Sequence, residues 1–93
     1  MLNTKSITLL ARRDHLEAMR VAAGLTIYGH EVRLIFMDHV LSQQDAQSEQ
    51  AELLELTDIE PETTLEEMSD VLTYLDPSQL AKALLECDGV VNI

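Results

Sequence analysis

The first forty residues alternate between a strand-like and a helical spacing of apolar positions. Lys5–Ala11 is a short β-branched and apolar run, which predicts a strand. Asp14 can cap a following helix, and Glu17 stands at the spacing of a capping box. Gly29 suits the position just after a helix, so we predict a helix over residues 14–28. Its inward stripe is formed by Leu16, Met19, Ala23 and Ile27.

A second strand, Glu31–Met37, follows directly. Strand, helix and strand with short connections form a βαβ unit, which implies parallel pairing. Ser42 can cap a second helix that extends to about Leu56. The stripe of this helix is approximated by Ala46, Gln50, Leu53, Leu54 and Leu56.

The segment 57–69 is ambiguous between strand and loop. Pro61 breaks any long helix, and Thr63–Leu65 fits a short edge-like strand followed by a turn of helix. Asp70–Leu75 then predicts a further strand.

The C-terminal part has the clearest local signal. Asp76 is a good N-cap, Pro77 suits the first helical position and Gln79 the third, so a helix is predicted to run to about Glu86. Gly89–Ile93 is the final strand. The whole pattern predicts one domain over residues 1–93. Its fold class is α/β: a flavodoxin-like, doubly wound, mostly parallel sheet of four or five strands with helices on both faces.

The net charge of the chain argues against one class of function, nucleic-acid binding. The net charge of −11 opposes binding to a phosphate backbone, and three aromatic residues provide little surface for base stacking, so we expect no nucleic-acid partner. Residues 1–40 carry five basic and four acidic side chains (+1), whereas residues 41–93 carry one and thirteen (−12). The acidic half fits either a solvated surface or a patch for a basic partner.

The same sequence predicts a cytoplasmic protein. No signal peptide is recognisable at the start, and no segment approaches the length of a membrane span, so no membrane association is expected. A single cysteine excludes an internal disulfide and fits a reducing compartment. The core of such a short chain is thin, which makes oligomerisation unsurprising.

Parallel sheets bind ligands beyond the carboxyl ends of their strands. The predicted topology places five chemistry-bearing residues there, after the first two strands: Arg12, Arg13, His15, Asp38 and His39. Two guanidiniums beside a helix start favour an anion, unless they pair with nearby acids. No glycine-rich phosphate loop is present, and the histidines and Asp38 lack a recognised metal-ligand spacing, so no cofactor and no metal are expected.

Cys87 is predicted at the opposite, amino edge of the sheet, because it follows the last helix and precedes the last strand. Glu86 and Asp88 disfavour a thiolate by like-charge repulsion, and apolar neighbours indicate partial burial. We therefore expect a structural thiol and no catalytic residue at this position.

Three segments together resemble the DsrE/DsrF-like family, in its TusC/TusD-related branch. They are a "GHEV"-like turn within Gly24–Asp38 with an acidic loop after the second strand, the segment Leu53–Glu60, and the closing strand Leu84–Ile93. The resemblance implies a cytoplasmic flavodoxin-like subunit that forms homo-oligomers, or hetero-oligomers with related subunits. Several relatives carry persulfide sulfur in sulfur relay on a cysteine near the third strand. The corresponding segment here, Pro61–Met68, contains no cysteine.

Three functional hypotheses follow. The first is a non-catalytic subunit associated with sulfur metabolism or sulfur relay, which acts through oligomerisation or partner docking and is not itself an enzyme. The second is a small-anion-binding module that uses the Arg12, Arg13 and His39 edge. The third is a sulfur carrier that uses Cys87 in an unexpected position.

Overall fold

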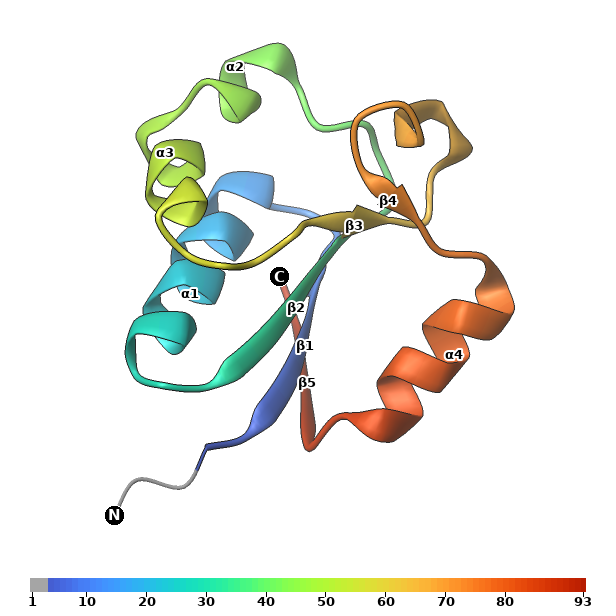
Figure 1. Cartoon of the computed structure of the whole chain (residues 1–93). Helices are drawn as coiled ribbons and strands as arrows, with labels where there is room; N and C mark the ends of the chain where they lie inside the picture. Colours follow the sequence, from blue (N-terminus) through green and yellow to red (C-terminus); the bar gives the residue numbers. More distant parts are fainter. Residues whose placement is uncertain (1–3) are drawn as a thin grey trace.

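The computed structural model describes residues 4–93 and contains a five-stranded parallel sheet between two helical layers (Figure 1). In chain order its elements are β1 (Ser6–Ala11), α1 (His15–Ile27), β2 (Glu31–Phe36), α2 (Gln43–Ala46), α3 (Glu49–Glu55), β3 (Glu62–Thr63), the 3₁₀ turn η1 (Glu66–Met68), β4 (Thr73–Tyr74), α4 (Pro77–Glu86) and β5 (Gly89–Asn92).

The strand order is β4-β3-β2-β1-β5, and every neighbouring pair is parallel. Central strand β1 aligns Leu9 with Leu34 of β2 and with Val91 of β5. The chain winds outward from β1 to β4 and then crosses back through α4 to place β5 on the other side of β1 (Figure 1). This confirms the α/β, flavodoxin-like doubly wound fold and fixes the number of strands in the described part at five.

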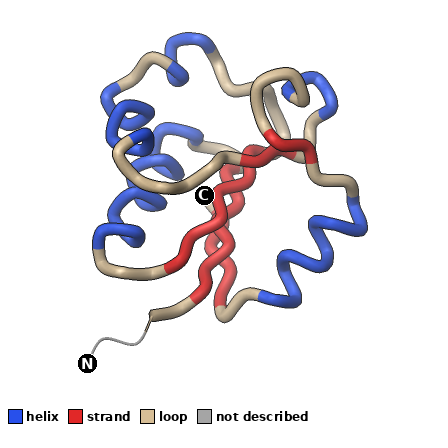
Figure 2. Tube along the Cα trace, viewed as in Figure 1, coloured by secondary structure: helices blue, strands red, loops and turns tan. Residues whose placement is uncertain are grey.

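Alternation along β1 and β2 divides the core between the two faces of the sheet. Leu9 and Leu34 face α1 and α3, whereas Leu10 and Ile35 face α4. In Figure 2 the strands run between α1 and α3 on one side and α4 on the other. The α1 side holds the larger cluster, built from Leu9, Ala11, Ala18, Met19, Ala22, Leu34, Phe36 and Leu54. The cluster on the α4 side has three buried members, Leu10, Ile35 and Leu75, and Ala83 of α4 is buried as well. One face of the sheet is therefore well covered and the other thinly.

The predicted single helix from Ser42 to Leu56 is wrong, because the chain forms α2 and α3 with a break at Gln47–Ser48. Ser42 does cap α2, where its hydroxyl accepts from the Asp45 N–H. The Ser48 hydroxyl donates to the Asp45 carbonyl (2.6 Å) and accepts from the backbone N–H of the first turn of α3. A serine that bonds to its local backbone in this way competes with helix continuation.

Two predicted stripes also need correction. Ile27 and Leu56 are exposed, and Leu54 is the buried residue of α3. Met19 and Ala23 of the predicted α1 stripe are buried, which confirms that part of it, and α1 also buries His15, Ala18 and Ala22. The three alanines have short side chains and let α1 lie close to the sheet. The buried face of α1 therefore excludes Ile27, which the spacing of large apolar residues had placed on it. Asp14 caps α1 as predicted, and Gly29 adopts a φ of +94° just beyond its end.

The ambiguous segment contains a strand, but not an edge strand. β3 pairs with β2 on one side and β4 on the other. The strand predicted over Asp70–Leu75 shortens to the two residues of β4, since residues 69–72 form a turn after η1. Helix α4 matches its prediction, and Asp76 and Gln79 form both hydrogen bonds of a capping box.

Candidate functional site at the carboxyl edge of the sheet

The loop between β1 and α1 lies where the strand order reverses, the usual ligand position in such sheets. Three consecutive backbone N–H groups, those of Arg12, Arg13 and Asp14, donate to one main-chain oxygen of Ile93 at 3.2, 2.8 and 3.3 Å. This loop therefore forms an N–H nest of the kind that binds anions, and here it holds an oxygen atom of the chain's own β5 end.

A small pocket of about 140 Å³ adjoins the nest. Arg12, Arg13, Asn92 and Ile93 line it. Arg13 is exposed and has no ion pair within residues 4–93. Its guanidinium is consequently the group at this edge that can meet an external anion without first losing an internal partner.

Arg12 has such a partner. Its Nε donates to Asp38 Oδ2 at 3.2 Å, and both side chains are about half exposed. Asp38 follows β2 with a φ of +71°, and the N–H of His39 donates across it to the Met37 carbonyl at 2.8 Å. This i to i+2 bond with a positive φ is a γ-turn of the rare, strained kind. The alternative in which the arginines pair with nearby acids therefore holds for Arg12.

His15 is the buried member of the predicted set, with 2% of its surface exposed. Its ring stacks on the His39 ring at 3.9 Å between centroids, nearly parallel at 6°, and meets Phe36 edge-on at 5.0 Å. His15 Nε2 lies 3.4 Å from the Met37 carbonyl oxygen. Burial lowers the pKa of His15 below its ordinary value of 6.5, and the neighbouring His39 adds to this decrease.

The structure thus divides the predicted site into two parts. Arg12, His15, Asp38 and His39 form one connected cluster around the turn at Asp38. Arg13 lies outside this cluster and lines the pocket beside β5, which Arg12 also lines. Within residues 4–93 no three histidine, cysteine, aspartate or glutamate side chains are arranged to hold a metal ion.

Cys87 lies at the amino edge, as the topology predicted. It is half-buried at the C-cap of α4, and its Sγ–H donates to the Leu84 carbonyl at 3.3 Å. The adjacent Asp88 is fastened to the start of β1 by two hydrogen bonds with Ser6. No histidine in the described chain forms a hydrogen bond with the thiol.

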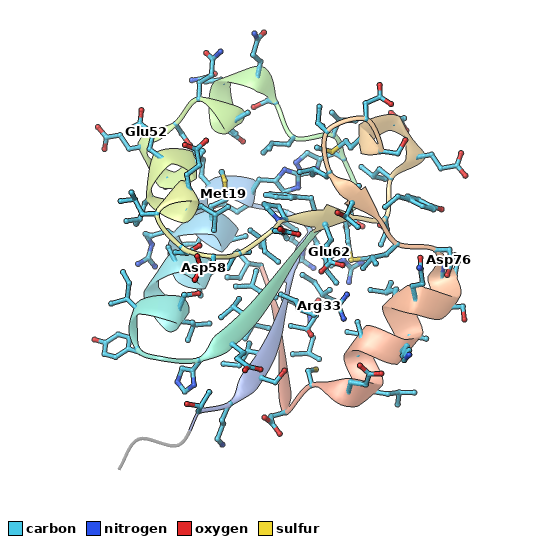
Figure 3. The ribbon with its side chains drawn as sticks, in the orientation of Figure 1. Met19, Arg33, Glu52, Asp58, Glu62 and Asp76 are labelled. Carbon is cyan, nitrogen blue, oxygen red and sulfur yellow. The ribbon has the colours of Figure 1, made fainter. Side chains whose placement is uncertain are left out.

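Two features were missed by reasoning from the sequence. Arg33 and Glu62 form a two-bond ion pair under α4, beside a groove of about 250 Å³ lined by Arg33, Leu75, Gln79, Lys82, Ala83 and Glu86 (Figure 3). Asn92 and Ile93 were likewise interpreted as strand residues only. Arg33 could have been noticed in the sequence, because it is a charged residue within an otherwise apolar part of a strand. The sequence held no comparable sign that Ile93 contacts the loop after β1.

No protein-family model, curated protein or solved structure matches this chain. The resemblance to DsrE/DsrF-like proteins, with the function and oligomeric habit that it implies, therefore stays a prediction. No helix within residues 4–93 has the length and apolarity needed to span a membrane.

Proposed function

We propose that the protein is a non-catalytic DsrE/DsrF-like subunit that acts by docking to a second copy of itself or to a related subunit, in sulfur metabolism or relay. The observation that carries this proposal is the exposed apolar corner formed by Leu85, at the end of α4, and Val90 of β5. Leu85 is 86% exposed, and Val90 is exposed as well. Only the short connection Cys87–Asp88 separates the two elements.

Strand β5 adds a second reason. It pairs with β1 on one side, and its outer edge has no neighbouring strand among residues 4–93. Open edges of apolar strands readily accept another chain and are usually protected. Val90 shares its register position with Thr8, on the thinly covered α4 side of the sheet. An interface there would cover the edge, the corner and the thin face together.

The cysteine supports a role without transfer chemistry. Sulfur carriers need an accessible thiol that is readily converted to a thiolate. Cys87 is half-buried, is engaged with the Leu84 carbonyl and stands between Glu86 and Asp88.

The test is the oligomeric state, measured by native mass spectrometry at micromolar concentration. The natural sequence is expected to form a multimer, and the double variant Leu85→Ser, Val90→Ser to be monomeric. Leu56→Ser is the matched control, because Leu56 is equally exposed (85%) but lies at the end of α3 on the opposite side of the sheet. A monomeric natural protein, or a Leu56→Ser variant that dissociates equally, would contradict the proposal.

Small-anion binding is a second candidate. It is supported by Arg13, which has no ion pair among the described residues and lies beside the pocket at the strand-order reversal. Phosphate or sulfate should then raise the melting temperature, and Arg13→Ala should abolish the increase. Arg20→Ala is the control, because Arg20 is an exposed arginine of α1 that pairs with Glu17 away from this pocket. An unchanged melting curve in the presence of both anions would remove this candidate.

A further inference from the structure

The turn at Asp38 stores backbone strain. A φ of +71° is unusual for any residue other than glycine, and γ-turns of this sign are rare. Strained residues persist only where the surrounding contacts hold them. Met37, before the turn residue, is held by the Ala11 carbonyl and by His15 Nε2. Asp38 and His39 are held by the Arg12–Asp38 ion pair and by the stack between His39 and His15.

The ion pair is a weak restraint, because both of its partners are about half exposed to solvent. The histidine stack joins the turn to a fixed element. His15 belongs to the first turn of α1 and is buried against Phe36, whereas His39 is exposed on the turn itself. The start of the turn is fastened to β1, because the Met37 N–H donates to the Ala11 carbonyl at 2.9 Å. The stack is therefore the contact that ties the far end of the turn, at His39, to the body of the protein.

The hydrogen bond between His15 and Met37 shows which ring nitrogen of His15 carries the proton. The Met37 carbonyl can only accept, so Nε2 carries the hydrogen that points to it. His15 Nδ1 is buried and has no hydrogen-bond partner among the described residues. A second proton would have to enter at Nδ1. The Ala11 backbone favours the resulting charge, but burial and the His39 ring, 3.9 Å away between ring centroids, outweigh it.

The charged groups around His15 act in both directions. From the loop after β2, His39 opposes a charge on His15, and Asp38 is engaged by Arg12. From α2, Asp45 favours the charge but is outweighed by burial and by His39, so the pKa of His15 is lowered. From β2 the contacting residue is the uncharged Phe36. In the loop before α1, the Asp14 carboxylate caps Glu17, and Arg13 faces the pocket beside β5.

We propose that the His15–His39 stack is an acid-sensitive latch, which holds the strained turn at Asp38 against the start of α1 at neutral pH and releases it when His15 takes up a proton. Protonation favours any conformation in which Nδ1 reaches water, and for this the stack must separate. The turn then loses its main restraint, and Asp38 can relax to an ordinary φ. This inference does not depend on the proposed function.

Amide hydrogen exchange followed by NMR, with the full-length protein between about pH 7.5 and pH 5, tests the latch. The reporters are the N–H groups of His39 and Leu41, which donate to the Met37 carbonyl and to Met68 Sδ. After correction for intrinsic rates, their protection should fall by about tenfold per pH unit once His15 begins to be protonated in the open form. The Leu9 amide of β1 should not respond. Unchanged protection of His39 and Leu41 across this range would overturn the proposal.

Three histidine variants test whether the stack causes the change in amide protection with pH. His15→Phe keeps an aromatic ring against Phe36 but cannot be protonated, so the protection of His39 and Leu41 should stay high at both ends of the range. His39→Ala should lose protection at neutral pH already. His30→Gln, at the third histidine and far from the turn, should respond like the natural protein. A His15→Phe variant that retains the pH response would contradict the latch. If that variant does not fold, a His39→Ala protein whose Leu41 amide is fully protected at neutral pH would contradict it equally.

Discussion

Arg33 of β2 and Glu62 of β3 are joined by two hydrogen bonds on the α4 side of the sheet (Figure 3). The Nε–Oε1 distance is 3.0 Å and the Nη2–Oε2 distance is 2.8 Å. The side chain of Glu62 is 13% exposed and that of Arg33 is 40% exposed. The hydrogen bond from Arg33 to Glu62 raises the pKa of Arg33. Because β3 has only two residues, this bidentate pair does much to fasten it to β2.

We therefore predict that Arg33→Met destabilises the protein by about 1–2 kcal/mol, because it leaves the Glu62 carboxylate nearly buried without a partner. The value stays below that of a fully buried pair, since Arg33 is partly solvated. Urea unfolding followed by circular dichroism measures the change. Arg20→Met removes an exposed pair with Glu17 and should cost clearly less stability than Arg33→Met. Equal losses in the two variants would contradict this prediction.

Elements that depend on neighbouring residues in the chain could be predicted from the sequence, and elements that depend on distant residues could not. The Asp76, Pro77 and Gln79 combination defines the start of α4 through neighbouring groups alone, so its bounds were predictable. β3 and β4 have two residues each; β3 exists because β2 offers it a partner edge, and β4 because β3 does. Such short strands depend on tertiary pairing, which a pattern along the chain does not encode.

The candidate site shows the same division. Topology was enough to bring Arg12, His15, Asp38 and His39 to one edge, because parallel strands end together. The ring stack and the positive φ of Asp38 were not predictable, since each depends on contacts between segments more than twenty residues apart. The bonds from the β1–α1 loop to Ile93 join residues about eighty positions apart.

Two glycines, one inside α1 and one just beyond its end, give a matched pair of predictions. Gly24 lies within the helix and has open space where the Cβ of an alanine would lie, so Gly24→Ala should stabilise the protein by about 0.5–1 kcal/mol. Gly29 also has open space but adopts a φ of +94°, so Gly29→Ala should destabilise it by about 1 kcal/mol. Thermal unfolding of both variants at one pH provides the measurement. Changes of the same sign would show that backbone conformation is not the deciding factor.

The buried His15 makes stability dependent on pH, and the sign follows from its lowered pKa. Between the folded pKa and the ordinary value of 6.5, the unfolded chain binds more protons than the folded one. The free energy of unfolding therefore falls as the pH decreases through 6.5 and levels off below the folded pKa. In urea titrations, His15→Phe should show a shallower decrease over this window than the natural protein. Parallel curves for the two proteins would exclude His15 as the cause.

Cys87 provides the sharpest test of whether the chain has sulfur chemistry of its own. Its Sγ–H already donates to the Leu84 carbonyl, and the side chain is half-buried, so attack on a persulfide donor should be slow. After incubation with a small-molecule persulfide donor, the intact mass should show no stable gain of a sulfur atom. Cys87→Ser is the control, and it should fold with less than about 0.5 kcal/mol lost, because a hydroxyl can make the same bond. A gain of one sulfur in the natural protein that is absent from Cys87→Ser would make this thiol a carrier. A relay function would then rest on the amino edge of the sheet, at the opposite end of the strands from the Arg12 and His39 cluster.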